Sequence, residues 1–323
     1  MGSGGRDITF GVILPIGRRL ELLGIEDPIA KWETTVATAV RAESLGYDSV
    51  WVYDHVHNVP VPSHETVFEC WTTLAAVSQR TDRVRLGHLV GNNLFRPPTL
   101  VAKMAATVDV MSGGRLEWGI GTGWDRGELE AYGYELPPPA ERIDMLAEAV
   151  QLVRALWTEP DVDFDGRFYR ARGAQCDPKP LQLPHPPIWI GGAGERRTLR
   201  VVAQLADRSN FGGSPTEWRH KSDVLTSHCE AVGRDPATIV RTWSHDAYLV
   251  EDESELDAAP AALWGESPST WREANLVGTP KGVVERLREY VEHGCRGFVI
   301  WCADAPNTRT LDLFAEHVIP EFR

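Results

Sequence analysis

The sequence predicts one α/β domain built as a (β/α)8 TIM barrel, and three observations lead to this prediction. Short apolar runs of strand length alternate with helical stretches from end to end, as in parallel β/α folds. Eight such units fit into 323 residues, which suits one barrel with insertions after the fourth and seventh strands better than an open doubly wound sheet. No linker or change in composition divides residues 1–323, so a single domain is expected.

The first half of the chain contains four strands, each followed by helical sequence. Asp27 followed by Pro28 predicts a helix N-terminus, and Gly46 predicts the end of that helix. The expected strands are 8–14, 49–53, 84–90 and 115–120. The expected helices are 27–45, 65–79, 98–111, 126–132 and 140–157.

The second half resumes the alternation after an insertion. Asp165-Gly166 is a favourable turn dipeptide, so 161–170 is expected to form a β-hairpin. The later strands are expected at 188–190, 207–211, 238–250 and 297–301, and the helices at 195–205, 216–232, 280–293 and 307–319. The acidic segment 251–260 is expected to be an exposed loop or a short helix.

Charge and composition argue against several classes of partner. The formal net charge is -13, so no basic face for nucleic acid is expected. No apolar run reaches the ~18 residues of a membrane span, and residues 1–7 lack the apolar core of a signal peptide, so a cytoplasmic protein is expected. The scattered cysteines indicate buried, reduced thiols; they are Cys70, Cys176, Cys229, Cys295 and Cys302.

Residues that follow the strands of such a barrel meet at one face, where catalytic groups gather. Asp54 and His55 follow the second strand. An imidazole can move a proton near neutral pH, and a neighbouring carboxylate can orient a loop or a ring. A histidine that only hydrogen-bonds the strand end is the alternative, and at this position we favour the functional interpretation. His57 and His64 are interpreted as residues of the rim.

Small residues follow the next two strands. Asn92 comes after the third strand, and Gly121-Thr122-Gly123 comes after the fourth, before Trp124. Glycines let a planar ligand approach the backbone, but this spacing lacks the third glycine of a dinucleotide fingerprint. Taken alone, each segment is also typical of an ordinary loop or of tight packing between a strand and a helix.

A glycine-rich turn follows the fifth strand and leads into a helix. The backbone N–H groups of this turn would form a phosphate cradle at the helix N-terminus, with Arg196 or Arg197 nearby. A flexible turn is equally compatible with this motif alone. Several tryptophans lie at predicted strand ends, where some would line an apolar pocket for a flat ring: Trp51, Trp118, Trp124, Trp189, Trp243 and Trp301.

Four segments, in this order, resemble the luciferase-like monooxygenase superfamily. They are SVWVYDH, then RVRLGHLV followed by Asn and Arg-Pro-Pro, then GGRLEWGIGTGW, and then PPIWIGGAGERRTLRVVAQLAD. With GTPKGVVERLREYVEHG, they look closest to its F420-dependent oxidoreductase branch, which is common in actinobacteria. The likeness spans residues 10–300.

The resemblance implies a bacterial luciferase-like barrel with a deazaflavin or flavin ring in its mouth. Asp54 would contact the deazaflavin head group, and His55 would donate a proton or polarise the substrate near the ring. Leu89-Val90 matches the non-proline cis peptide that bends the ring in many members. The other implied cofactor contacts are those of Asn92, Gly121, Thr122 and Gly123 with the ring and of Gly192, Ala193, Gly194 and Glu195 with the phosphate.

Two positions depart from the family pattern. In the sugar-phosphate dehydrogenases a carboxylate follows Gly-Thr-Gly, whereas this chain has Trp124, so a bulkier and more apolar substrate is expected. Relatives often have Gln in the Leu-Pro-Gln-Gly motif after the first strand, whereas this chain has Ile16. A polar contact at the substrate mouth would therefore be missing.

These features predict an oxidoreductase that moves a hydride between coenzyme F420 and a small organic substrate. The alternatives are a monooxygenase that uses reduced FMN and oxygen, and a non-catalytic barrel that only holds a cofactor. A zinc site at the His55-x-His57 pair ranks low because no further ligands complete it, so no metal is expected. The expected partners are a small-molecule substrate, a separate reductase that supplies reduced cofactor and, as in many relatives, a second copy of the chain.

Overall fold

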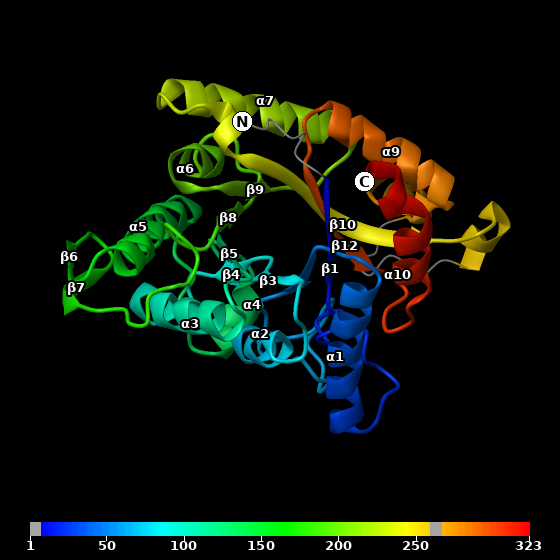
Figure 1. Ribbon diagram of the computed structural model, residues 1–323, viewed down its shortest axis with the longest axis horizontal. Helices are drawn as coiled ribbons and strands as arrows, with labels where there is room; N and C mark the ends of the chain where they lie inside the picture. The colour runs from blue at the N-terminus through cyan, green and yellow to red at the C-terminus, as the bar shows by residue number, and fades with distance from the viewer. Residues whose placement is uncertain (1–7, 259–266) are drawn as a thin grey trace.

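The computed structural model describes residues 8–258 and 267–323, and it confirms the predicted parallel barrel (Figure 1). The strand β9 pairs with both β8 and β10, which closes the sheet on itself. The barrel strands are β1 (Thr9–Ile13), β2 (Ser49–Val52), β3 (Arg85–His88), β5 (Leu116–Gly121), β8 (Ile188–Gly191), β9 (Arg208–Asn210), β10 (Val240–Leu249) and β12 (Gly297–Cys302). A two-residue strand, β4 (Gly91–Asn92), extends β3 and pairs with β5.

Helices surround this barrel (Figure 1). They are α1 (Pro28–Ser44), α2 (Cys70–Ser78), α3 (Pro98–Met111), α5 (Pro139–Thr158), α6 (Thr198–Leu205), α7 (Pro215–Ala231), α9 (Pro280–Glu292) and α10 (Arg309–Leu313). The chain then ends in a π turn (Phe314–Val318) and a 3-10 turn (Ile319–Phe322), and a further 3-10 turn (Pro236–Thr238) precedes β10. No helix in the two described ranges combines the length and the apolar character needed to cross a membrane.

Both predicted insertions are present. After β5 the chain adds α4 (Arg126–Ala131) and, following α5, the antiparallel hairpin β6 (Val162–Asp165) and β7 (Arg170–Ala174). After β10 it adds a 3-10 turn (Glu253–Ala258), α8 (Pro268–Ala274) and β11 (Leu276–Gly278). The expected loop or short helix at 251–260 is a short helix as far as 258, and its last two residues lie outside the described ranges.

Two helices begin three or more residues later than the sequence predicts. The helix expected from 65 begins at Cys70, because the side chain of Glu69 accepts a hydrogen bond from the Thr72 N–H at 2.7 Å and caps the helix there. The helix expected from 195 begins at Thr198, after a turn at 195–197. The glycine-rich segment therefore does not run straight into α6.

Aromatic side chains fill the barrel interior below the catalytic face expected for this fold. The rings of Trp51 and Trp189 lie 4.6 Å apart between centroids, and Ile13, Val299 and Trp301 pack with them. Most of the tryptophans expected at strand ends are therefore core residues, with Trp124 as the exception. All five cysteines are buried and free, as predicted.

One close approach in the barrel wall yields a stability prediction. A Cβ atom on Gly119 would lie 2.0 Å from the backbone oxygen of His88, so the Gly119→Ala variant must displace a strand. We expect it to lose about 1–3 kcal/mol of unfolding free energy, measured by denaturant unfolding followed by circular dichroism.

Gly282→Ala provides the matched control, because its Cβ would meet nothing closer than Thr279 Oγ1 at 3.8 Å on an exposed helix. This variant should be neutral or gain up to about 1 kcal/mol. Equal stability of the two variants would contradict the packing described for β3 and β5.

Candidate active site

The carboxyl ends of the barrel strands surround a cavity of about 440 Å³, a size typical of small-molecule sites. Its wall is built from the chain that follows β1, β2, β3, β5 and β8 and from the upper ends of β9 and β10. The lining residues are Ile13, Arg18, Arg19, Tyr53, Asp54, His55, Val59, Leu89, Val90, Gly91, Asn92, Gly121, Thr122, Gly123, Trp124, Gly191, Gly192, Asn210, Ser244, His245 and Asp246.

His55 lies in the wall of this cavity, and Glu128 of α4 orients its ring. His55 Nδ1 lies 2.7 Å from Glu128 Oε2. Because an ionised carboxylate only accepts hydrogen bonds, Nδ1 carries the proton of the neutral ring. Nε2 has no hydrogen-bond partner among the described residues and keeps its lone pair. Glu128 therefore sets the tautomer in which His55 can accept a proton at Nε2.

The second oxygen of Glu128 fixes the backbone that follows His55. Glu128 Oε1 accepts hydrogen bonds from the N–H groups of Val56 at 2.6 Å and His57 at 2.9 Å. Burial alone would raise the pKa of Glu128, but these bonds and the His55 contact outweigh burial and lower it. The contact therefore stabilises the fold above the usual glutamate pKa, and this contribution is lost as the pH falls through the lowered value.

Arg18, which follows β1, lies against the same carboxylate. Its guanidinium is 3.6 Å from Glu128 and 3.2 Å from Asp125, and it donates a hydrogen bond to the His57 carbonyl oxygen. Burial lowers the pKa of Arg18, and the two carboxylates oppose this effect. His57 itself packs against Tyr132 and joins no cluster of metal-ligating side chains in the described part of the chain.

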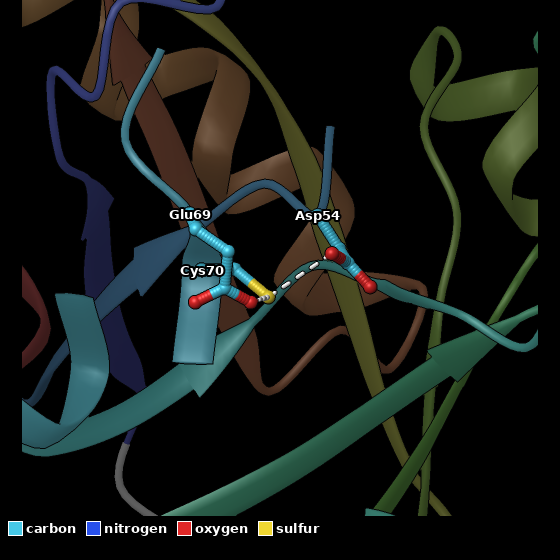
Figure 2. Close-up of side chains that lie close together, drawn as sticks. All are labelled: Asp54, Glu69 and Cys70. Carbon is cyan, nitrogen blue, oxygen red and sulfur yellow. Dashed lines mark hydrogen bonds between the residues drawn. The ribbon is translucent and has the colours of Figure 1, made fainter. Parts of the chain in front are cut away.

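Asp54 connects the second and third strands behind the cavity. Its carboxylate accepts a hydrogen bond from the Asn92 N–H at 2.8 Å and pairs with Arg96 at 2.7 Å. Figure 2 shows the Cys70 thiol pointing at this carboxylate, with Sγ 3.1 Å from Oδ1. Burial, reinforced by Asp54, raises the pKa of Cys70 well above its usual value, so the thiol stays protonated and donates. Arg96 also pairs with Glu69 at 2.6 Å, so one guanidinium lies between the two carboxylates and offsets part of their charge.

Glycines around Val90 form a smooth part of the cavity floor. The Leu89-Val90 peptide is cis, as the sequence resemblance implied. A Cβ on Gly121 would lie 2.6 Å from the Val90 side chain, and a Cβ on Gly191 would lie 2.9 Å from it. Only glycine at these two positions lets β5 and β8 close around Val90. A flat ring fits against a floor without side-chain projections.

The turn after β8 presents free backbone donors. Gly192 has φ +121°, lines the cavity and donates its N–H to the Asn210 carbonyl at 3.2 Å. The N–H groups of Ala193, Gly194 and Glu195 have no protein acceptor among the described residues. Successive free N–H groups of this kind suit a phosphate. The Glu195 carboxylate points elsewhere and pairs with Lys221 at 2.5 Å.

The structure brings most predicted site residues together. Asp54, His55, Leu89, Val90, Asn92, Gly121, Thr122, Gly123, Trp124 and Gly192 all line the one cavity. The side chain of Ile16 does not, and its expected place at the substrate mouth is wrong. Ile16 accepts a backbone hydrogen bond from Phe68 N–H at 2.9 Å, and its side chain is fully buried in the core. Ala193, Gly194 and Glu195 lie beyond the cavity lining.

Sequence reasoning missed Glu128 and the two arginines after β1. Asp125 and Glu128 have the spacing of a helix capping box, which hides the contact to His55. Arg18 and Arg19 directly follow the first strand, so the rule that barrel sites lie after strands could have found them. Asn210, Ser244, His245 and Asp246 come from the strands that the motifs did not cover.

Comparison with known proteins gives one family and several relatives. The model of the luciferase-like monooxygenase family matches residues 8–274. An F420-dependent glucose-6-phosphate dehydrogenase of Amycolatopsis mediterranei (strain U-32) is 37% identical and aligns over 89% of this chain and 94% of its own length. An uncharacterized protein of Mycobacterium tuberculosis (strain ATCC 25618 / H37Rv) is 33% identical, and the match covers 54% of this chain and 66% of that protein.

Solved structures share the fold over nearly the whole chain. An F420-dependent secondary alcohol dehydrogenase in complex with an F420-acetone adduct superposes with a TM-score of 0.82 at 22% identity, covering 98% of this chain and 99% of that one. A monooxygenase from Streptomyces bottropensis superposes with a TM-score of 0.81 at 25% identity, covering 98% and 100%. At 22% identity, the likeness to the alcohol dehydrogenase is one of fold.

The Glu128 contact predicts the protonation pattern of His55. The Glu128→Gln variant has the same shape but loses the charge, and its amide can donate to Nδ1, so the proton of the neutral ring should move to Nε2. Nitrogen-15 NMR of the imidazole should report the Nδ1–H form in the wild type and a shift toward Nε2–H in the variant.

Glu130→Gln is the matched control, because Glu130 lies on the same helix, is exposed and, within residues 8–258 and 267–323, pairs only with Arg126. It should leave the His55 signals unchanged. An Nε2–H tautomer in the wild type at neutral pH would contradict the role given to Glu128.

Proposed function

This chain belongs to the luciferase-like monooxygenase family, and we propose that it is an F420-dependent oxidoreductase acting on an organic substrate. One observation carries the proposal. A cavity at the strand ends combines a smooth glycine-lined floor, an oriented imidazole at His55 and a turn with free N–H groups that begins at Gly192. The 37% identical relative whose name specifies F420 supports the choice of cofactor.

The residues present fit such a cofactor. The floor at Val90, Gly121 and Gly191 accepts a flat ring, because neither glycine has a side chain that would project into the cavity. The contact with Val90 also excludes larger residues at these two positions. Leu89, Asn92, Thr122 and Gly123 would flank the ring, with Asp54 holding the Asn92 backbone in place. The N–H groups of Ala193, Gly194 and Glu195 would hold the phosphate. When bound, the reduced deazaflavin supplies a hydride.

His55 accepts or donates the proton that accompanies hydride transfer. With Nδ1 held by Glu128, Nε2 takes a proton from a substrate hydroxyl, and the resulting imidazolium lies against a buried carboxylate that stabilises its charge. In the opposite direction the imidazolium returns the proton to a carbonyl oxygen. Sustained reduction of substrates requires a supply of reduced cofactor, so the proposal includes a separate reductase.

A flavin-dependent monooxygenase is the second candidate, and the likeness to the Streptomyces bottropensis monooxygenase favours it specifically. The same floor and phosphate turn would accept FMN. The two candidates differ in their need for oxygen, because a deazaflavin does not activate it.

Cofactor binding is the first test. Titration of the protein with oxidised F420 and with FMN, followed by cofactor fluorescence, should give at least tenfold tighter binding of F420. Tighter binding of FMN together with substrate-dependent oxygen uptake would overturn the proposal in favour of the monooxygenase.

Substitution of His55 tests the chemical role. His55→Ala should reduce turnover with reduced F420 by about 10²- to 10⁴-fold, the usual contribution of a positioned acid or base, while F420 affinity changes little. Turnover is followed as formation of oxidised F420 across a panel of ketones. His64→Ala, at an exposed loop position, is the control. Undiminished turnover in His55→Ala would remove His55 from the mechanism.

A further inference from the structure

The charged side chains that line the cavity are already paired within the protein. Arg18 pairs with Asp125 and Glu128. Arg19 pairs with Asp246 at 2.6 Å and stacks over the ring of Trp301 at 4.0 Å. Among the described lining residues, therefore, every guanidinium has an acidic partner, and an anionic substrate would have to break an existing pair to gain one.

Acidic groups also stand directly behind the reactive side of the cavity. Asp54 and Glu69 share the single cation of Arg96, and Glu128 and Asp125 share the single cation of Arg18. A phosphate or carboxylate placed beside His55 would thus face more negative than positive charge. The pocket favours a neutral group next to His55.

One residue of the cavity lining, Trp124, and two tyrosines that follow it within ten residues carry exposed aromatic side chains, which we call the aromatic rim. Trp124, Tyr132 and Tyr134 are 60%, 52% and 38% exposed, and they are the exposed aromatic residues of the two described ranges. Trp124 and Tyr132 stand just outside the two ends of α4, the helix that carries Glu128. Exposed aromatic groups gathered at the edge of a pocket mark a surface that an apolar ligand covers.

Trp124 connects the rim to the reactive centre, and the two tyrosines pack on the segments that follow β2 and β4. The Trp124 ring lies 5.8 Å from the His55 ring, and the Tyr132 ring lies 5.1 Å from the His57 ring, between centroids. The Tyr134 ring lies 5.3 Å from that of Phe95, which follows β4. A ligand whose polar end reaches His55 would therefore lay an attached chain across Trp124 toward Tyr132.

We infer that the substrate is a neutral carbonyl compound or alcohol with an extended apolar tail, which lies on the aromatic rim. The inference rests on the proposed oxidoreductase function and narrows its substrate class. In the reducing direction the carbonyl carbon gains the hydride that F420 loses, the carbon–oxygen π pair moves to oxygen, and oxygen takes the proton from His55. The apolar tail takes no part in this exchange and contributes binding only.

Binding of a homologous series of ketones to the full chain tests the inference without relying on turnover. Calorimetric titration with 2-pentanone, 2-heptanone, 2-nonanone and 2-undecanone should give affinity that rises about threefold per added methylene, somewhat below the effect of full burial. Octanoate, an anion of comparable length, should bind at least tenfold more weakly than 2-nonanone. Affinity that does not change along the series, or octanoate binding as tightly as 2-nonanone, would overturn the inference.

Variants of the aromatic rim test where the apolar tail of the ketone binds. Tyr132→Ala should flatten the rise for the longer ketones and leave 2-pentanone affinity nearly unchanged, whereas Trp124→Ala, in the cavity lining, should weaken all four ketones and the longer ones most. Both side chains are exposed enough to be removed without loss of the fold. Leu183→Ala, at a 90% exposed position outside the cavity lining, is the control and should keep the full rise. A full rise in both rim variants would overturn the inference. Failure of F420 to bind would instead overturn the proposed function. The two outcomes can be distinguished because the ketone titrations are done without F420.

Discussion

The site depends on one buried carboxylate. Glu128 comes from the insertion after β5, yet its two oxygens bind His55 and the backbone of the next two residues after β2. Without these acceptors the loop after β2 would have unpaired N–H groups, and the imidazole could rotate or change tautomer. Arg18 supplies the compensating charge from the loop after β1. A single side chain thus connects three βα segments and determines where a proton can be accepted.

A second constraint is steric and acts on the floor of the cavity. Val90 reaches between β5 and β8, and both strands have glycine at the point of contact. The same glycines that allow this packing also leave the floor flat. Asp54 then holds the chain after β3 through the Asn92 N–H. Barrel closure, cavity shape and cofactor fit are therefore consequences of the same few contacts.

The fold could be predicted from the sequence because its signals are local. Asp27 caps α1 through its side chain, as the Asp-Pro pair predicted, and α3 has the predicted bounds, 98–111. The residues that follow the strands could be predicted to form a site, because barrel topology brings the strand ends to one face. His55, Asn92, Gly123 and Gly192 were identified in this way, and they meet in one cavity.

The features that the sequence did not predict depend on contacts between segments that are distant in the sequence. Glu128 resembles an ordinary third residue of a capped helix, and only the position of the β2 loop reveals its partner, 73 residues away in the chain. Ile16 was placed at the mouth by analogy with a family position, whereas its backbone pairs with Phe68 and its side chain lies in the core. The start of α6 shifted because a turn at 195–197 follows the glycines, and the N–H groups of Ala193, Gly194 and Glu195 are left free among the described residues.

The central claim is that one cavity holds a flat redox ring beside His55 and its phosphate at the turn that begins at Gly192. A crystal structure of the protein with oxidised F420 tests this most directly. We expect the ring to lie against Val90 and the phosphate to lie within hydrogen-bond distance of the N–H groups of Gly194 and Glu195. A cofactor bound outside this cavity, or with its phosphate remote from that turn, would show that the cavity is not the cofactor site.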